Sequence, residues 1–297
     1  MERRALSARV TVLVGVRAGR YPHGNSLLVT GAEEALLLDP SLTVARLPAG
    51  ELPAVDRVVN SHCHEDHIAG NHRFPAAPWH FHDEDLPGIG SLDAMMAIYG
   101  MPGAIGAAFQ RVVVEEFHYT PRSDGLGYAD GAVFDLGGVR VRMLHAPGHT
   151  RGHSVALVEP DGVLYLGDID LSSFGPYYGD AWSSLEDFER TLRFVRTLEA
   201  RWYATFHHIG VLAGRAAFLE RLDRFAAVIQ SREERLLAYL AMPHTLDEIA
   251  AHRFVYRPGD AVPFAEAVER RSMAQHLARL VAAGGVRELE AGRFVAA

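Results

Sequence analysis

The sequence His-Cys-His-Glu-Asp-His at residues 62–67 is the feature that most constrains this chain. It follows a β-branched run at 55–60, which predicts a short strand, and precedes residues 68–71, which can open a helix. Several potential metal ligands therefore lie in one strand-to-helix turn. This spacing favours a functional metal site over a histidine-rich surface loop or a structural metal clip.

Alternate side chains of an extended segment share a face. His62 and His64 can therefore reach one ion while Cys63 points away, as expected for a small buried side chain. The following turn brings Asp66 and His67 beside them. A mixture of imidazole and carboxylate ligands suits a divalent cation such as Zn(II), Mn(II) or Fe(II).

Two downstream segments carry further ligands. His149 lies in Ala-Pro-Gly-His-Thr at 146–150, and Asp168 ends a run of strand character. Residues 155–158 and 163–166 between them predict a hairpin. Since a hairpin returns the chain to its starting edge, we expect Asp168 to lie beside the loop that holds His149.

A fourth segment follows the strand-like residues 202–206, where His207 and His208 are adjacent. Four ligand-bearing segments, each at the end of a predicted strand, are hard to explain by packing alone. Two other polar residues invite orienting roles. Asp39 ends an apolar run and needs a buried partner, and His153 is expected to support His149.

With these motifs in hand, residues 10–212 resemble the metallo-β-lactamase superfamily, in the branch of glyoxalase II-like hydrolases. The resemblance includes the order of the motifs, HxHxDH, PGHT, GD and a late His, together with the apolar segments 25–29 and 36–39. It implies an α+β fold, a four-layer αββα sandwich with two metal ions at one edge of the sheets. An Asp at the bridging position argues against a dedicated lactamase.

Carried over residue by residue, the resemblance implies that His62, His64 and His149 hold the first ion. Asp66, His67 and a late histidine would hold the second ion, with Asp168 bridging. We favour His207 as the late ligand because it directly follows the strand, and keep His208 as the alternative. The two ions are expected to be zinc, with manganese or iron also compatible.

Such a centre would hold a bridging hydroxide that attacks an acyl substrate, either a thioester, an ester or a lactone. Asp66 could also orient the hydroxide. Tyr177 and Tyr178 follow the bridging Asp168 and are candidates for donating a proton or hydrogen bond to the substrate, although loop packing explains them equally well. The alternatives are a metal-dependent endoribonuclease and a non-catalytic interaction module with a vestigial metal site.

From residue 213 apolar residues recur at the three- and four-residue intervals typical of helices. We therefore divide the chain into a catalytic domain, 1–212, and a helical domain, 213–297. A capping-box signature begins at Thr245. Helices are predicted at 216–229, at 231–240, from 245 onward and at 264–283, followed by a hairpin over 286–295. This order is typical of a winged-helix-like module.

Charge and composition bound the partners. The chain carries a net charge of −8, and residues 213–297 hold 12 arginines against 11 acidic residues, so no strong field for nucleic acid is expected. The sequence predicts no membrane span and no signal peptide. The single cysteine, Cys63, fits a cytoplasmic protein. An apolar helical stripe at 92–99 predicts core packing or, alternatively, a lid or homodimer surface.

Overall fold

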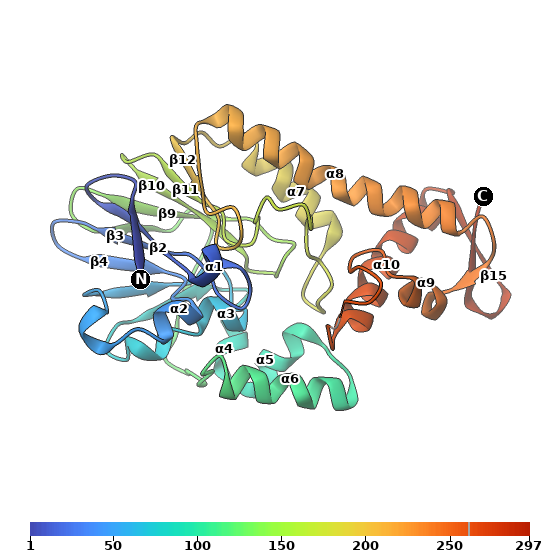
Figure 1. Cartoon of the computed structure of the whole chain (residues 1–297), viewed down its shortest axis with the longest axis horizontal. Coiled ribbons are helices and arrows are strands. Elements are labelled where there is room, and N and C mark those ends of the chain that lie inside the picture. Colours follow the sequence, from blue (N-terminus) through green and yellow to red (C-terminus); the bar gives the residue numbers. More distant parts are fainter. Residues whose placement is uncertain (261) are drawn as a thin grey trace.

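The computed structural model describes residues 1–260 and 262–297. Two β-sheets pack face to face, with α4 to α6 on one outer side and α7 and α8 on the other (Figure 1). The four-layer α+β arrangement predicted from the sequence is therefore confirmed.

The first sheet has seven strands in sequential order. Antiparallel pairing joins the first four, and parallel pairing joins the last four. The strands are β1 (Glu2–Ala5), β2 (Val10–Val14), β3 (Ser26–Thr30), β4 (Ala35–Leu38), β5 (Arg57–Val59), β6 (Trp79–His82) and β7 (Leu126–Tyr128). The parallel pairing directs the C-terminal ends of β4 and β5 to one edge of the sheet, where Asp39 and the hexad follow.

The second sheet has the order β13-β12-β11-β10-β9-β8. Its strands are β8 (Val133–Asp135), β9 (Arg140–His145), β10 (Ser154–Glu159), β11 (Val163–Tyr165), β12 (Trp202–Ala204) and β13 (Val211–Ala213). The predicted β10–β11 hairpin is confirmed. Strand β11 pairs in parallel with β12, so the segments carrying Asp168 and His207 leave the sheet side by side.

Three hydrophobic clusters hold the four layers together. One lies between the sheets and includes Leu27 and Val141, both fully buried. A second packs the first sheet against α5 (Leu92–Tyr99) and α6 (Gly103–Glu115). The third packs the second sheet against α7 (Leu185–Val195) and the first half of α8 (Arg215–Tyr239).

The apolar stripe predicted at 92–99 is helix α5, and Met95 and Tyr99 from this stripe are buried in the second cluster. Cys63 is buried in the same cluster. The remaining short helices precede or follow strands of the first sheet. They are α1 (Val16–Gly19), α2 (Leu42–Ala45), α3 (Glu65–Ile68) and α4 (Pro87–Gly90).

The predicted break between helices at 216–229 and 231–240 is wrong, because both segments belong to the continuous helix α8. The residues at the junction are Gln230 and Ser231. Neither is a glycine or a proline, the residues that most often end a helix. Ile229, Arg232 and Leu236 continue one buried stripe across it. Figure 1 shows α8 running from the sheets into the C-terminal region.

The C-terminal region has its own hydrophobic cluster, built on Leu236, Leu240, Ile249 and Leu277. Its elements are β14 (His244–Thr245), α9 (Leu246–His252), α10 (Ala265–Ala282), β15 (Val286–Leu289) and β16 (Arg293–Ala296). The predicted capping box at Thr245 and the terminal hairpin are confirmed. Strand β14 adds a third strand to the hairpin. The winged-helix-like interpretation of this region stays a prediction.

None of the helices in the described chain combines the length and apolar character needed to cross a membrane.

Candidate metal centre

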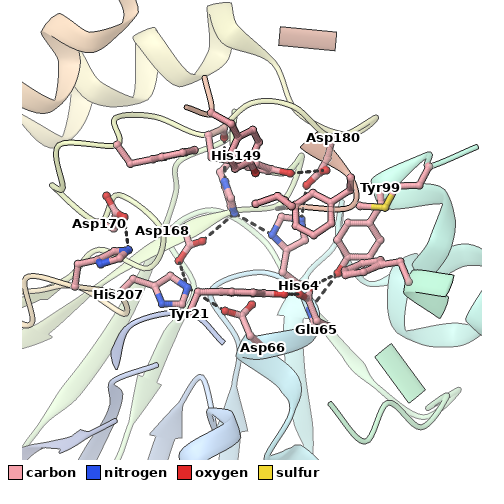
Figure 2. A pocket seen from close by; sticks show the side chains of 18 residues that line it. Tyr21, His64, Glu65, Asp66, Tyr99, His149, Asp168, Asp170, Asp180 and His207 are labelled. Carbon is pink, nitrogen blue, oxygen red and sulfur yellow. Dashed lines mark hydrogen bonds and ion pairs between the residues drawn. The ribbon is translucent and has the colours of Figure 1, made fainter. Parts of the chain in front are cut away.

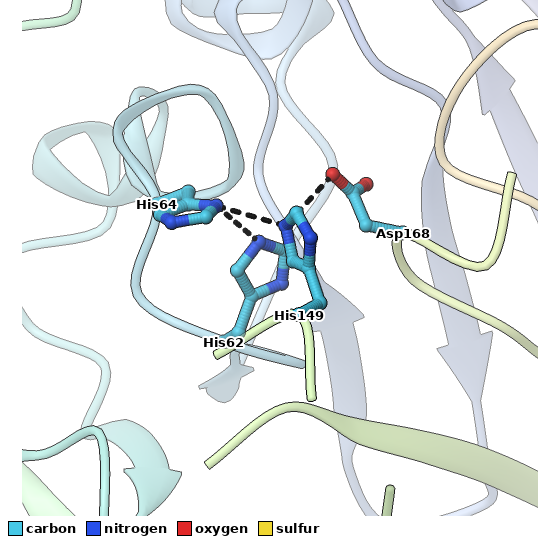
Figure 3. Close-up of side chains that lie close together, drawn as sticks. All are labelled: His62, His64, His149 and Asp168. Atoms are coloured by element: carbon cyan, nitrogen blue, oxygen red, sulfur yellow. Dashed lines mark hydrogen bonds and ion pairs between the residues drawn. The ribbon is translucent and has the colours of Figure 1, made fainter. Parts of the chain in front are cut away.

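Three imidazoles and one carboxylate meet where β5, β9 and β11 end. His64 Nδ1 lies 3.1 Å from His62 Nε2 and 2.9 Å from His149 Nε2. Asp168 Oδ2 completes the group at 3.1 Å from His149 Nε2 (Figure 3). All four ligand atoms lie within 4.8 Å of one another, so they could hold one ion.

A second group adjoins the first. Asp66 and His67 lie on α3, and His207 follows β12; their ligand atoms also lie within 4.8 Å of one another. His67 Nε2 lies 2.9 Å from Asp168 Oδ1, whereas Asp168 Oδ2 faces His149 in the first group. Asp168 therefore presents one oxygen to each group, which is the position of a bridging ligand.

The remaining ring nitrogen of each histidine in these groups faces a polar atom, and for each except His64 the contact is a hydrogen bond. The Nδ1 atoms of His62, His149 and His207 lie 3.1 Å from Ser61 Oγ, 3.1 Å from the Tyr177 carbonyl oxygen and 2.8 Å from the Gly19 carbonyl oxygen. Such partners fix the orientation of metal-binding imidazoles and leave the opposite nitrogen for the ion.

Asp39 organises the loop that carries the hexad. Its Oδ1 accepts a hydrogen bond from the Ser61 backbone N–H at 2.6 Å, and its Oδ2 lies 2.8 Å from His67 Nδ1. The Ser61 and Tyr165 hydroxyls also donate to Oδ2. The structure thus places Asp39 where the sequence predicts a residue that orients a ligand loop. His153 lies in the same layer, with Nε2 accepting from the Asp168 backbone N–H at 3.1 Å.

Two buried atoms of the centre lack a hydrogen bond within the described residues, namely His64 Nε2 and Asp66 Oδ2. His64 Nε2 lies 3.2 Å from Asp180 Oδ2, and Asp66 Oδ2 lies 2.9 Å from His207 Nε2. Neither contact has the alignment of a hydrogen bond. Buried polar atoms are rarely left without a partner. A divalent cation beside Asp66 and His207 fits this arrangement, because it would satisfy an oxygen and a nitrogen that do not satisfy each other.

The electrostatics of two residues of the first group, His62 and Asp168, fit a cation. Burial lowers the pKa of His62 well below its usual value, and the neighbouring His67, His64 and His149 lower it further. The neutral imidazole that results is the form that binds metal. Burial raises the pKa of Asp168, but the surrounding imidazoles outweigh burial and hold this pKa well below its usual value. Asp168 is therefore ionised, as a metal-binding carboxylate must be.

A cavity of about 360 Å³ opens over both groups (Figure 2). Side chains from both groups line its floor, and Met101, Phe109 and Phe174 line its wall, with Tyr256 and Phe264 from the C-terminal region. Sequence reasoning missed this contribution because the two C-terminal residues lie far from every motif.

The two tyrosines predicted as catalytic have different positions. Tyr177 lines the cavity, and its hydroxyl donates to Asp180 Oδ1 at 3.0 Å. The predicted catalytic role does not fit the position of Tyr178, which is buried outside this cavity. Its hydroxyl lies 2.9 Å from His276 Nε2 and accepts a hydrogen bond from Arg232. Successive side chains in this extended loop point to opposite sides, so only one of the pair can face the centre.

The two late histidines separate in the same way. His207 is buried beside Asp66, whereas His208 has a backbone φ of 55° and a half-buried ring whose Nε2 lies 3.7 Å from Asp170 Oδ2. Of the two, only His207 joins a ligand group within the described residues.

Glu65 lies in the cavity wall and was overlooked although it is part of the hexad. Its carboxylate accepts hydrogen bonds from the Tyr21 hydroxyl at 3.0 Å and from the Tyr99 hydroxyl at 2.5 Å. Burial and the nearby Asp66 raise the pKa of Glu65 to about 7. The three side chains join α3, α5 and the loop before β3 around the mouth of the centre, as Figure 2 shows.

Comparisons with known proteins agree with this geometry. Residues 20–223 match the family model described as "Metallo-beta-lactamase superfamily". A hydroxyacylglutathione hydrolase of Acidiphilium cryptum is 30% identical over 247 residues, which cover 80% of this chain and 87% of that protein. An atrochrysone carboxyl ACP thioesterase of Emericella nidulans is 24% identical over 206 residues, or 69% of this chain and 54% of that protein.

For this thioesterase and three other curated relatives, the chain spans only 53–62% of the relative's length. Among solved structures, a metallo-beta-lactamase family protein from Thermus thermophilus superposes with a TM-score of 0.71 at 25% identity. That match covers 99% of this chain and all of that one. The chain belongs to the metallo-beta-lactamase superfamily.

Proposed function

We propose that this chain is a hydrolase that uses two divalent cations, with zinc as the first candidate, to cleave an acyl substrate. The observation that carries the proposal is the pair of ligand groups that meet at Asp168 on the floor of one cavity. Relatives named as hydroxyacylglutathione hydrolase and as ACP thioesterase support a thioester as the substrate class, ahead of an ester or a lactone.

When bound, the two cations would lower the pKa of a shared water and polarise the acyl carbonyl. His62, His64 and His149 would hold one cation, and Asp66, His67 and His207 the other. Asp168 places a negative charge between the two groups, where it offsets the repulsion between two cations. In the reaction, the water oxygen bonds to the acyl carbon and the carbon–sulfur bond breaks. The thiol then leaves with the proton.

The protein itself supplies orientation. The Tyr177 hydroxyl fixes Asp180, and Asp180 faces the outer nitrogen of His64, so the cavity wall holds a ligand ring in place. Glu65, held by Tyr21 and Tyr99, stands at the mouth and could position the polar end of an entering acyl group. The apolar wall at Met101 and Phe109 would exclude water from the reacting carbon.

The cavity wall favours an acyl substrate over a phosphodiester chain. Among the described residues that line this cavity there is no arginine, and its wall contains Glu65, Asp170 and Asp180. A nucleic-acid backbone binds through clustered cations. The ribonuclease alternative is therefore the weaker proposal. The alternative of a non-catalytic interaction module does not explain why imidazole rings from both groups line a common cavity.

The test compares metal content and turnover in the same samples. Chelation is expected to abolish hydrolysis of a thioester panel, and added zinc or manganese to restore it. His62→Ala is expected to lower the metal-to-protein ratio without changing the circular dichroism, whereas His252→Ala, at an exposed position on α9, should retain both metals. Full activity of metal-free protein, or an unchanged metal ratio in His62→Ala, would contradict the proposal.

A further inference from the structure

A second cavity of about 630 Å³ adjoins the one above the metal centre, since Phe174, His208 and Tyr256 line both. Its wall comes from the loop before β3, the loop at 172–174, His208, helix α8 and the segment between α9 and α10. Five arginines line it: Arg20, Arg232, Arg235, Arg253 and Arg257. Such a concentration is unexpected in a chain with a net charge of −8.

These arginines are not neutralised by the protein. Within the described residues none of the five forms an ion pair, and the carboxylate in the cavity wall is Asp260, which accepts from the Arg257 backbone N–H at 3.0 Å. Arg20 and Arg257 are exposed, and no hydrogen bond from either guanidinium is found in the described chain. Two guanidinium groups are therefore available to a ligand.

The other three arginines shape the cavity. Arg232 is buried and donates to the carbonyl oxygens of Phe174 and Pro176. Arg235 donates to the Phe254 carbonyl oxygen, and Arg253 donates to the Asp260 carbonyl oxygen at 2.9 Å. Their positive charges remain, because a carbonyl oxygen satisfies a donor without cancelling its charge. The cavity is thus positively charged, with three of its five arginines held in place by carbonyl oxygens.

We infer that this cavity binds the phosphate groups of the carrier to which the acyl group is attached, so that the substrate is a thioester of a phosphate-bearing thiol of the coenzyme A type. The inference rests on the proposed function. It places the acyl group in the apolar cavity over the metal centre and the phosphates against Arg20 and Arg257. Guanidinium groups match phosphate in charge and in hydrogen-bond geometry.

Two competing anions fit less well. Glutathione carries two carboxylates that an ammonium group partly offsets, which is a poor match for an arginine cluster with one carboxylate in its wall. An RNA chain would need a basic track that continues to the metal centre, but Glu65, Asp170 and Asp180 lie in the intervening cavity. A small carrier with several phosphates satisfies both cavities together.

The experiment compares one acyl group on two carriers. Wild-type protein with its metals is expected to hydrolyse the coenzyme A thioester with kcat/KM about tenfold or more above that of the pantetheine thioester, which lacks phosphate, with the difference mostly in KM. Arg257→Gln should raise KM for the coenzyme A thioester about tenfold and leave the pantetheine thioester unchanged. Arg190→Gln is the matched control, since Arg190 is an exposed arginine on α7 whose loss should affect neither substrate.

Calorimetric titration of free coenzyme A separates this inference from the proposed function. Binding that is weakened by Arg257→Gln and by added salt, in a protein that hydrolyses no thioester, would leave the phosphate site standing and refute the hydrolase. Equal kcat/KM for the two carriers would overturn the phosphate site while the hydrolase stands. Tighter binding of glutathione, or of an oligoribonucleotide, than of coenzyme A at the same salt would also overturn it.

Discussion

Helix α8 joins the catalytic sheets to the C-terminal region, and removing it should unfold the protein. Its first half places Phe218, Leu222, Phe225 and Ile229 in the cluster beneath the second sheet, each 0–4% exposed. Loss of a buried leucine or phenylalanine side chain costs about 2–5 kcal/mol, so four such losses amount to roughly 10 kcal/mol or more. Net stabilities of domains are about 5–15 kcal/mol. A chain ending at Gly214 is therefore expected to be insoluble or unfolded.

The matched comparison is a chain ending at Glu234, which keeps all four side chains and also Arg232 but loses the C-terminal cluster and the cavity wall at Tyr256. We expect it to be soluble, to unfold cooperatively in denaturant and to hydrolyse its substrate with a raised KM. Phe225→Ala in the full chain should cost about 3–5 kcal/mol in the free energy of unfolding. A soluble chain ending at Gly214, with the same denaturation midpoint as the chain ending at Glu234, would refute this reasoning.

Three further predictions follow from the centre and the core. Asp168→Asn should lower the metal-to-protein ratio with little change in the free energy of unfolding; both metals and a wild-type rate would argue against bridging. Tyr178→Phe should cost about 1 kcal/mol of stability and leave kcat unchanged, whereas Tyr177→Phe should weaken metal affinity; the opposite pattern would return Tyr178 to a catalytic role. Burial and the nearby Arg57 lower the pKa of His80 to about 4 from the usual 6.5, so folding favours its neutral form. Its stabilising contribution is complete above pH 6.5 and is lost as the pH falls towards 4. His80→Leu should therefore reduce the loss of stability between pH 7 and pH 4.5 by about 2 kcal/mol, measured by denaturant unfolding.

The grouping of the candidate metal ligands was predictable because their signals are local. The hexad combines strand alternation with a tight turn, and the β10–β11 hairpin fixes the return of Asp168. Where two equivalent residues are adjacent, local signals are weaker. The end of the predicted strand favoured His207 over His208, but no spacing distinguishes Tyr177 from Tyr178, whose hydroxyls contact Asp180 and His276, respectively. The predicted break in α8 failed for another reason, since tertiary packing continues the helix across a polar junction.

The basic cavity could not be predicted from charge counts. Residues 213–297 are nearly neutral overall, and the arginines of the cavity come from three separate segments, including Arg20 near the start of the chain. Net charge averages over a surface, whereas a ligand responds to the field in one hollow. Folding gathers Arg20 and Arg257 on the same cavity, whose described wall contains five arginines and a single carboxylate residue, Asp260.

Arg232 connects helix α8 to the loop beside the candidate metal centre. An arginine buried at 1% exposure would be costly unless its donors were satisfied, and here they reach the Phe174 and Pro176 carbonyl oxygens and the Tyr178 hydroxyl. The loop that it holds also supplies the Tyr177 carbonyl oxygen, which faces His149 Nδ1 at 3.1 Å. Arg232 on α8 therefore contacts the same loop that contacts the His149 ring. The same helix packs against the second sheet, holds this loop through Arg232 and contributes Arg232 and Arg235 to the basic cavity.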